Sequence, residues 1–238
     1  MRPAEFRIVR DRFAGGHGTT APVRLPDASP DRQAGGGGVI AALYVETNGC
    51  YFGLPNVDPW DKPRDARLYA GPHPVVAHPP CDRWCQMAPV NQARYGHKIG
   101  DDGGCFEAAL SAVRNWGGVL EHPALSYAWS AYRLPRPLSA GWIRTPCGGW
   151  VAHVEQRNYG HKARKATWLY AYGVDPPSLI WGAGPEPEAW ISTDRPRAEL
   201  RARGITQLTG KASRMTPLPF RDLLISMAEG VNAQRQAA

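Results

Sequence analysis

The sequence lacks a long hydrophobic run, and it contains only five cysteines. Its best apolar stretch, VIAALYV, falls far short of the roughly 20 residues that a membrane-spanning helix needs. The opening residues, MRPAEFRIVR, do not resemble the apolar segment of a signal peptide. The cysteine count is odd and the spacing is uneven, which does not suit a disulfide framework. We therefore expect a soluble, cytoplasmic protein with free thiols and no membrane partner.

The chain also lacks a balance of charge. Its 28 Lys and Arg residues exceed its 21 Asp and Glu residues, which gives a formal net charge of +7. The excess gathers at 161–165 and again at 195–214. An uneven basic excess suits a polyanionic partner, and nucleic acid is the leading candidate. The alternative is a solvated basic face without a specific partner.

No internal repeat divides the chain, but its composition changes once. Residues 1–38 contain HGTTAP, RLPDASP and a GGGG run with little apolar periodicity, which predicts a flexible leader. Residues 39–238 are then expected to form a single main domain, since 43% hydrophobic content suffices for one core. Within this domain, residues 181–215 or thereabouts form a small basic segment.

Apolar patterns predict alternating strands and helices from residue 39 onward. Helical spacing of apolar residues, closed by a glycine pair, predicts a helix in GGCFEAALSAVRNWGG, and a second amphipathic helix is predicted in LPFRDLLISMAEG. The connection at 53–71 has room only for a short helix. Runs rich in β-formers predict strands at 39–46, 74–77, 118–123, 150–156 and 167–173. The order predicts an α/β fold with a parallel sheet and helices on both faces.

The chemistry-bearing residues follow the predicted strands directly. In a parallel sheet, ligands bind at the carboxyl ends of the strands. The segments expected there are ETNG, HPPC, LEHP and GHKARK. Together they supply a glycine turn, a cysteine, a carboxylate and several cations. This set suits covalent chemistry on a pyrimidine ring, in which a thiolate adds to the ring, a carboxyl group polarises its nitrogen edge and cations hold phosphate.

Cys81, the cysteine of HPPC, permits three interpretations. A small buried thiol is the commonest fate of a cytosolic cysteine. A zinc site would combine His78, Cys81 and Cys85, with Cys105 or His97 as a further ligand, but the H-x2-C-x3-C spacing is unusual. A nucleophile is favoured by the presence of HPPC and LEHP in this order.

Four pieces of the sequence resemble the DNA cytosine-C5 methyltransferases, and especially their short, divergent bacteriophage forms. HPPC looks like the Pro-Pro-Cys motif, and LEHP looks like the strand-end Glu-Asn-Val or Glu-Asn-Pro motif. EQRNYGHKARKAT is similar to the Gln-Tyr-Gly and Arg-Lys-Pro-Thr of the phage forms, and SRMTPLPFRDLL is similar to their C-terminal Thr-Pro motif and helix. These pieces cover residues 40–228.

The resemblance implies a Rossmann-like, methyltransferase-type sheet and methyl transfer from S-adenosylmethionine to cytosine C5 in DNA. Cys81 would attack C6 of a flipped base, and Glu121 would hydrogen-bond the ring nitrogen edge. The resemblance further implies cofactor contacts at Gly49, Asp58, Asp65 and Pro79, and nucleotide contacts at Gln156, Arg157, Arg164 and Lys165.

The chain also departs from the family pattern. Gly49 alone stands for the glycine-rich cofactor loop, Asp82 replaces the glutamine after the cysteine, and His122 replaces the asparagine after the acid. The target-recognition region is reduced to the segment around 181–215. Two alternatives therefore stand beside methylation. One is another C5 modification of pyrimidines in DNA or a nucleotide, and the other is a nucleic-acid-binding descendant without catalysis.

Overall fold

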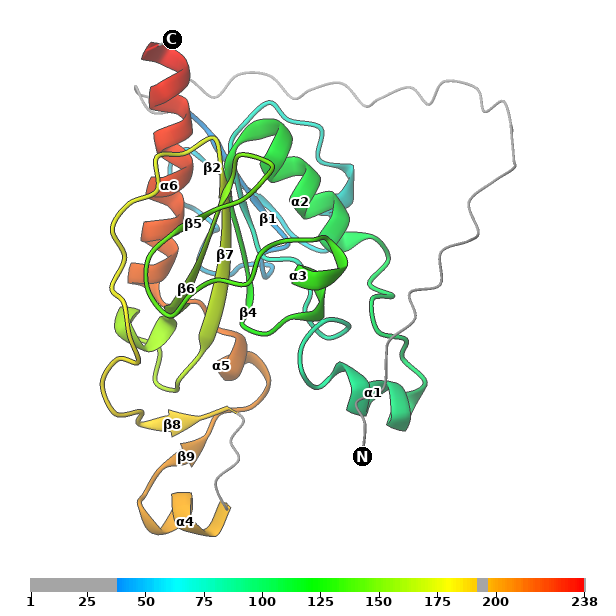
Figure 1. The fold of residues 1–238 in the computed structure, drawn as a ribbon, viewed down its shortest axis with the longest axis vertical. Coiled ribbons are helices and arrows are strands. Elements are labelled where there is room, and N and C mark those ends of the chain that lie inside the picture. The colour runs from blue at the N-terminus through cyan, green and yellow to red at the C-terminus, as the bar shows by residue number, and fades with distance from the viewer. Residues whose placement is uncertain (1–37, 192–196, 238) are drawn as a thin grey trace. The chain divides into compact units, whose positions relative to one another are not determined.

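Seven strands pair into one mixed sheet in the order β2-β1-β3-β4-β7-β6-β5 (Figure 1). This computed structural model describes residues 38–191 and 197–237, so the predicted leader lies outside the described residues except for Gly38. The strands of the sheet are β1 (Ile40–Leu43), β2 (Val57–Trp60), β3 (Val75–Ala77), β4 (Gly118–Pro123), β5 (Ile143–Arg144), β6 (Trp150–Glu155) and β7 (Ala166–Tyr172). A separate parallel pair consists of β8 (Ala189–Trp190) and β9 (Thr206–Gln207).

The helices connect and cover these strands. The α-helices are α1 (Ala88–Tyr95), α2 (Cys105–Trp116), α3 (Tyr127–Ala131), α4 (Arg197–Ala202), α5 (Gly210–Arg214) and α6 (Leu218–Ala237). Two short 3-10 helices are η1 (Ala66–Leu68) and η2 (Gln156–Tyr159). The helix predicted after Cys85 is α2, and the predicted closing helix is α6, which is longer than its apolar pattern suggested.

The predicted α/β class is confirmed, but the sheet is only partly parallel. Strands β1 to β4 are parallel to their neighbours. Strand β7 runs antiparallel to both β4 and β6, and β5 runs antiparallel to β6. The reason is the short connection at 156–165, because two strands joined by so few residues can pair only as an antiparallel hairpin.

The register places the predicted site segments at one edge of the sheet. Leu43 is paired with Ala77, and Ala77 with Leu120, so β1 and β3 end side by side and Glu121 of β4 lies just beyond their ends. Strand β6 runs parallel to β4, because both are antiparallel to β7. The turn between β6 and β7 therefore lies at this same carboxyl edge. The segments that follow the strands meet there, as the sequence predicted.

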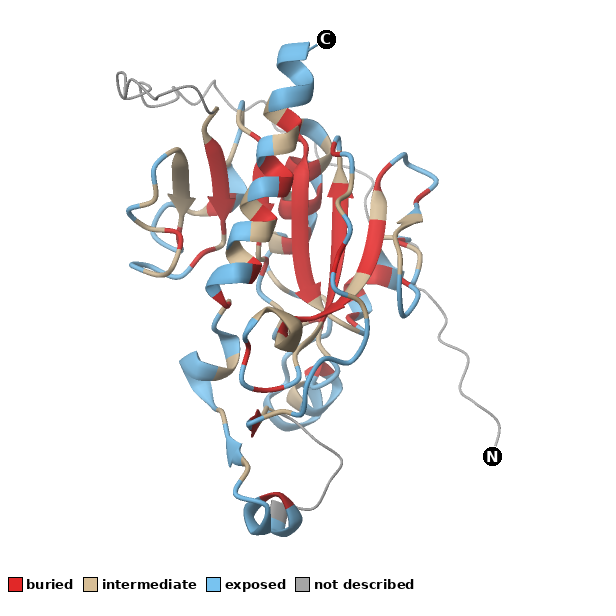
Figure 2. Cartoon of the chain, turned by 90° about the vertical axis from the view of Figure 1, so that its left-hand side faces the viewer, coloured by how far each residue is buried: buried red, intermediate tan, exposed pale blue. Residues whose placement is uncertain are grey.

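Each face of the sheet is covered by helices, which confirms the predicted layering. Phe106 and Leu110 of α2 pack on one face, in a buried cluster with Trp129 of α3. Leu224 and Met227 of α6 pack on the opposite face. Figure 1 shows α2 and α6 on either side of the sheet, and Figure 2 shows the central strands as the most buried part of the chain.

The connection at 53–71 differs from its prediction, because it contains strand β2 as well as the short helix η1. Asp58 and Pro59 concealed this strand, since both residue types are depleted in strands. Proline cannot donate to a ladder, but β2 is an edge strand that pairs only with β1. A proline is tolerated at such an edge.

The predicted basic segment around 181–215 forms short, mostly exposed elements instead of a packed domain. It contains β8, α4, β9 and α5, and residues 192–196 within it lie outside the described residues. None of the helices that the structure describes is long and apolar enough to cross a membrane.

Candidate active site

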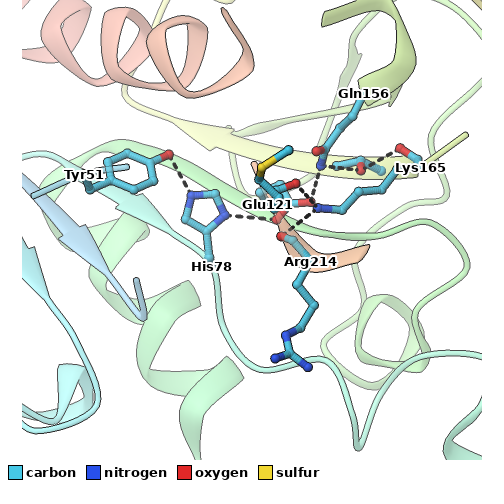
Figure 3. A network of polar contacts seen from close by, with 8 residues as sticks. Tyr51, His78, Glu121, Gln156, Lys165 and Arg214 are labelled. Atoms are coloured by element: carbon cyan, nitrogen blue, oxygen red, sulfur yellow. Dashed lines mark hydrogen bonds and ion pairs between the residues drawn. The ribbon is translucent and has the colours of Figure 1, made fainter. Parts of the chain in front are cut away.

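The site is centred on Glu121, a buried side chain of β4. Its Oε2 accepts a hydrogen bond from Nδ1 of His78 at 3.0 Å. Its Oε1 accepts one from Nε2 of Gln156, also at 3.0 Å (Figure 3). His78 directly follows β3 and Gln156 directly follows β6, so three strand ends converge on one carboxylate.

The environment of Glu121 keeps its carboxylate ionised. Burial alone would raise the pKa of this group, but the hydrogen bond from His78 and the positive charge of Lys165 outweigh that effect and lower the pKa to about 2. An ionised carboxylate can only accept hydrogen bonds. Glu121 therefore offers acceptor positions to whatever binds beside it.

Tyr51 extends this contact into a chain of three residues. Its hydroxyl lies 2.8 Å from Nε2 of His78, and its side chain is buried. Because Nδ1 of His78 must carry a hydrogen to reach the Glu121 carboxylate, Nε2 is free to accept from the tyrosine. Burial raises the pKa of Tyr51, so its hydroxyl keeps the proton that it donates. Tyr51 was not assigned a role from its sequence context, although it lies just after the ETNG turn.

Gln156 is held in one orientation by its neighbours. Its Nε2 donates to Thr167 Oγ1 at 3.0 Å as well as to Glu121. The Thr167 hydroxyl in turn donates to the backbone oxygen of Lys165 at 3.1 Å, so Thr167 must accept from the amide. The amide nitrogen of Gln156 thus faces the acid and the threonine.

Lys165 brings a positive charge to the same place. Its Nζ donates to the backbone oxygens of Arg214 and Met215, both at 3.2 Å (Figure 3). Burial lowers the pKa of Lys165, and the negative charge of Glu121 opposes that shift. The lysine therefore joins the turn after β6 to the segment that leads into α6, while its charge faces the acid.

The two predicted arginines lie differently. Arg157 donates to the backbone of His161 at 3.0 Å and to the carboxylate of Glu188 at 2.9 Å. It braces the β6–β7 turn against the segment before β8 and is not directed at Glu121. Arg164 is exposed on the same turn. Of the four residues predicted to contact nucleotide, Gln156 bonds the acid and Lys165 acts on it through its charge.

Cys81 lies in the turn that follows β3, and the turn carries a second thiol back to it. The backbone N–H groups of Trp84 and Cys85 both donate to the Cys81 carbonyl, at 3.0 and 2.8 Å. This single helical turn places the Cys85 side chain beside that of Cys81, and the two thiols share a hydrogen bond. In the sequence analysis, Cys85 was considered only as a zinc ligand.

The two sulfurs shift each other's pKa in opposite directions. The hydrogen bond to Cys85, together with burial and the charge of Glu121, raises the pKa of Cys81. The same hydrogen bond, with backbone N–H groups such as that of Met87, lowers the pKa of Cys85 to about 6. The two sulfurs can therefore hold one proton between them at neutral pH, and transfer of that proton to Cys85 would leave Cys81 as the thiolate.

His122, which stands where the family has asparagine, acts as a core residue. Its ring is fully buried, lies edge-on to Phe106 and is stacked with Trp129. Burial lowers its pKa to about 4, so the imidazole is neutral. Its role is packing beneath the acid.

Gly49 and Pro79 lie at the ends of neighbouring strands, as expected for a ligand crevice. Gly49 closes a tight turn with an N–H bond to the Glu46 carbonyl at 2.8 Å. A Cβ atom at Gly49 would lie 2.8 Å from that carbonyl oxygen, so the turn itself requires glycine. Pro79 is buried directly before the cysteine loop.

The predicted cofactor acids are engaged locally. Asp58 forms an ion pair with Arg64 and accepts from the Trp60 indole at 2.8 Å. Asp65 forms an ion pair with Arg67 at 2.7 Å. Each carboxylate is thus paired with an arginine that lies a few residues further along the chain.

A third acid, Asp61, has the location expected of a cofactor-binding acid, a role that the sequence analysis assigned to Asp58 and Asp65. Asp61 directly follows β2, is buried, and accepts a hydrogen bond from the Thr47 hydroxyl at 2.7 Å. Thr47 lies in the turn after β1, so a carboxylate and a hydroxyl meet where β1 and β2 end side by side. Asp61 is the first acid after VDPW, so it could have been found from the sequence if β2 had been predicted.

The residues considered for zinc contact other partners. His78 lies between Tyr51 and Glu121, and Cys81 is paired with Cys85. Within residues 38–191 and 197–237, no group of three or more His, Cys, Asp or Glu side chains is arranged to hold a metal ion.

Comparison with known proteins adds no family to this description. The candidate site therefore rests on the chain's own residues: Tyr51, His78, Cys81, Cys85, Glu121, Gln156, Lys165 and Thr167. No family model matches the chain, and no curated protein matches it significantly.

Proposed function

We propose that the protein modifies pyrimidines in DNA through a covalent bond to Cys81, and that the reaction is methyl transfer from S-adenosylmethionine to cytosine C5. The observation that carries the proposal is the convergence of the HPPC loop and Glu121 at one edge of the sheet, with Gln156 and Lys165 joining them. These are the segments, in the same order, on which the resemblance rests.

The paired thiols supply the nucleophile. Cys81 passes its proton to the Cys85 thiolate as its sulfur forms a bond to C6 of the base. The electrons of the C5=C6 double bond move toward C5 and the conjugated N3, which takes up a proton from solvent. After C5 has been methylated, N3 and C5 each release a proton to solvent, the sulfur–C6 bond breaks as the ring double bond returns, and the departing Cys81 sulfur recovers its proton from Cys85.

Glu121 and Lys165 stabilise the charges that this addition creates. Glu121 enters as a carboxylate, so it accepts hydrogen bonds from the protonated N3 edge or from an exocyclic amine. The His78 contact holds the acid in place before the base arrives, which is the preorganisation that electrostatic catalysis requires. Lys165 supplies the compensating positive charge.

S-adenosylmethionine, when bound, would supply the methyl group. The carboxyl ends of β1 and β2 would hold such a ligand through Asp61 and Thr47, because a carboxylate beside a hydroxyl suits ribose hydroxyl groups. The turn at Gly49 and the buried Pro79 would form its walls. Asp58 and Asp65, both paired with arginines, do not take part in this arrangement.

A second candidate function is a different C5 modification in the same pocket, on DNA or on a nucleotide. The observation that favours it is the engagement of Asp58 and Asp65, since the cofactor side departs from the predicted pattern more than the base side does. The thiol chemistry at C6 is the same in both cases, and only the group added at C5 differs.

Covalent trapping tests the proposal. DNA containing 5-fluorocytosine is mixed with S-adenosylmethionine and with wild type, Cys81→Ser or Cys147→Ser, and adducts are read by denaturing gel and intact mass. Cys147 is an exposed thiol in the turn between β5 and β6, away from Glu121, and serves as the matched control. We expect a methylated adduct with wild type and Cys147→Ser, and none with Cys81→Ser.

Two results would contradict the proposal. One is an adduct that persists in Cys81→Ser. The other is no adduct on any DNA tested together with no thermal stabilisation by S-adenosylmethionine, since a ligand of the folded state must raise stability by mass action. Stabilisation by S-adenosylmethionine without an adduct would refute the Cys81 chemistry alone.

A further inference from the structure

Gln156 carries a buried acceptor that has no donor among the described residues. Both hydrogens of its amide are used, one by Glu121 and one by Thr167. Its Oε1 is buried, and none of the described residues donates to it. The carboxylate of Glu121 and the hydroxyl of Thr167 fix the amide orientation, so the acceptor cannot be exchanged for a donor by a simple flip of the amide.

A buried acceptor without a donor is costly and rare in a folded protein. Here it lies beside Glu121, which is ionised and also presents only acceptor positions. Two adjacent side chains at the end of the sheet therefore favour a ligand edge that carries N–H donors. They disfavour an edge that carries a carbonyl oxygen.

We propose that Gln156 Oε1 is a specificity determinant that selects cytosine over uracil and thymine by accepting a hydrogen bond from the exocyclic amine at C4. This inference rests on the proposed function, and it adds the feature by which the base is chosen. Cytosine presents an N–H₂ donor at C4, whereas thymine and uracil present an oxygen acceptor there. A site built to hydrogen-bond one group rejects an analogue that leaves its buried polar atom unpaired.

The test compares two bases in each of four proteins. Duplex DNA carries either 5-fluorocytosine or 5-fluorouracil at one position, S-adenosylmethionine is present, and the readout is the ratio of the two adduct-formation rates. The variants are Gln156→Met, His78→Ala and Thr167→Val. We expect wild type to prefer 5-fluorocytosine by about 100-fold or more.

The three variants separate specificity from support of Glu121. Gln156→Met removes the acceptor, so the ratio should fall toward one. His78→Ala removes the other donor to Glu121, and Thr167→Val removes the second contact of the Gln156 amide. Both should slow the two bases alike and leave the ratio within about threefold of wild type, because the acceptor beside Glu121 remains. A merely structural Gln156 would change rates without changing the ratio.

A third base keeps the inference testable if Gln156→Met does not fold. DNA with 5-fluoropyrimidin-2-one, which has only hydrogen at C4, should react with wild type more slowly than 5-fluorocytosine and faster than 5-fluorouracil. Equal wild-type rates on all three bases, or an unchanged ratio in Gln156→Met, overturn the inference and leave the proposed function standing. No adduct with any base overturns both.

Discussion

The carboxyl edge of the sheet has two parts that are built in different ways. At β3, β4 and β6, Glu121 is buried and held by His78 and Gln156, residues 43 and 35 positions away. At β2, Asp58 and Asp65 are partly exposed and pair with arginines six and two positions away. The first part exists only when the whole sheet has assembled, whereas the second consists of contacts within one loop.

This difference shows which part of the edge depends on the assembled fold. A buried carboxylate with two donors is stabilised only by partners that the fold delivers to it. An exposed ion pair between near neighbours contributes little and is common on any surface. In the proposed site, the residues expected to bind the base are therefore held by contacts that depend on the fold. Among the described residues expected to bind the cofactor, Asp61 has a buried contact of this kind, with Thr47.

The sharpest test of this comparison is the stability of matched acid-to-amide variants. Glu121→Gln should lower the free energy of unfolding by about 2–3 kcal/mol, because it leaves buried donors facing an amide. Asp58→Asn should cost less than about 1 kcal/mol, since its ion pair is partly exposed. Urea unfolding of both variants measures the two values. Equal losses would remove the distinction between the two parts.

The pH dependence of stability gives an independent check on Glu121. Its pKa in the folded chain is about 2, below the ordinary value of 4.5. A lowered pKa contributes stability that is present above the unfolded pKa and is lost as the pH falls from about 4.5 to about 2. Wild type should lose on the order of 3 kcal/mol more than Glu121→Gln over this range. Parallel curves would show that the acid is not specifically stabilised.

The second-largest effect should come from Cys85. Cys85→Ser removes the sulfur that receives the proton of Cys81, and adduct formation at pH 7 should fall by about 10–100-fold. In wild type the rate should also fall as the pH drops below about 6, because Cys85 then becomes protonated. Rates of 5-fluorocytosine trapping across pH, with Cys147→Ser as the control, measure both effects. A Cys85→Ser rate equal to wild type would exclude the proton transfer.

A smaller effect is expected at the cofactor side. Asp61→Asn should weaken binding of S-adenosylmethionine by about tenfold, as expected when a charged acceptor is lost. Asp65→Asn, whose carboxylate is already paired with Arg67, should leave that affinity within about twofold. Thermal shifts measured across a titration with S-adenosylmethionine compare the affinities of the two variants. The reverse order would restore the original assignment of Asp65.

The smallest effect should be that of Tyr51→Phe. This variant removes the hydroxyl that contacts His78, the residue that in turn contacts Glu121. His78 would keep its contact with the acid but lose the partner that orients its ring, so adduct formation should fall by about three- to tenfold. Stability should fall by about 1 kcal/mol. Single-turnover trapping and urea unfolding measure these changes. An unaltered rate would show that Tyr51 does not contribute to the reaction.

Much of the fold could be predicted from sequence, because its strands are apolar runs and the carboxyl-edge rule depends only on their order. Cys81 and Glu121 could be brought together on this basis alone. Strand β2 could not, since Asp58 and Pro59 contradict strand propensity and only pairing with β1 makes the segment extended. Its omission in turn hid Asp61.

The contacts between side chains could not be predicted from the sequence either. Arg157 was expected to face the nucleotide, but whether it meets Glu188 or a phosphate depends on where the segment before β8 lies. Cys85 was separated from Cys81 by only three residues, and still its role depends on the helical turn between them. These outcomes are set by tertiary packing, which residue types and spacing do not encode directly.

Helix α6 has a consequence for the order in which the protein can be made. It covers one face of the sheet through residues such as Leu224, and Arg221 near its start bonds the Cys50 carbonyl, 171 positions earlier. During synthesis, that apolar face stays uncovered until α6 has left the ribosome, a state in which chains are prone to aggregate. A nascent chain that stalls before residue 214 would also lack the segment that Lys165 binds, so the site is completed only after this segment has been synthesised.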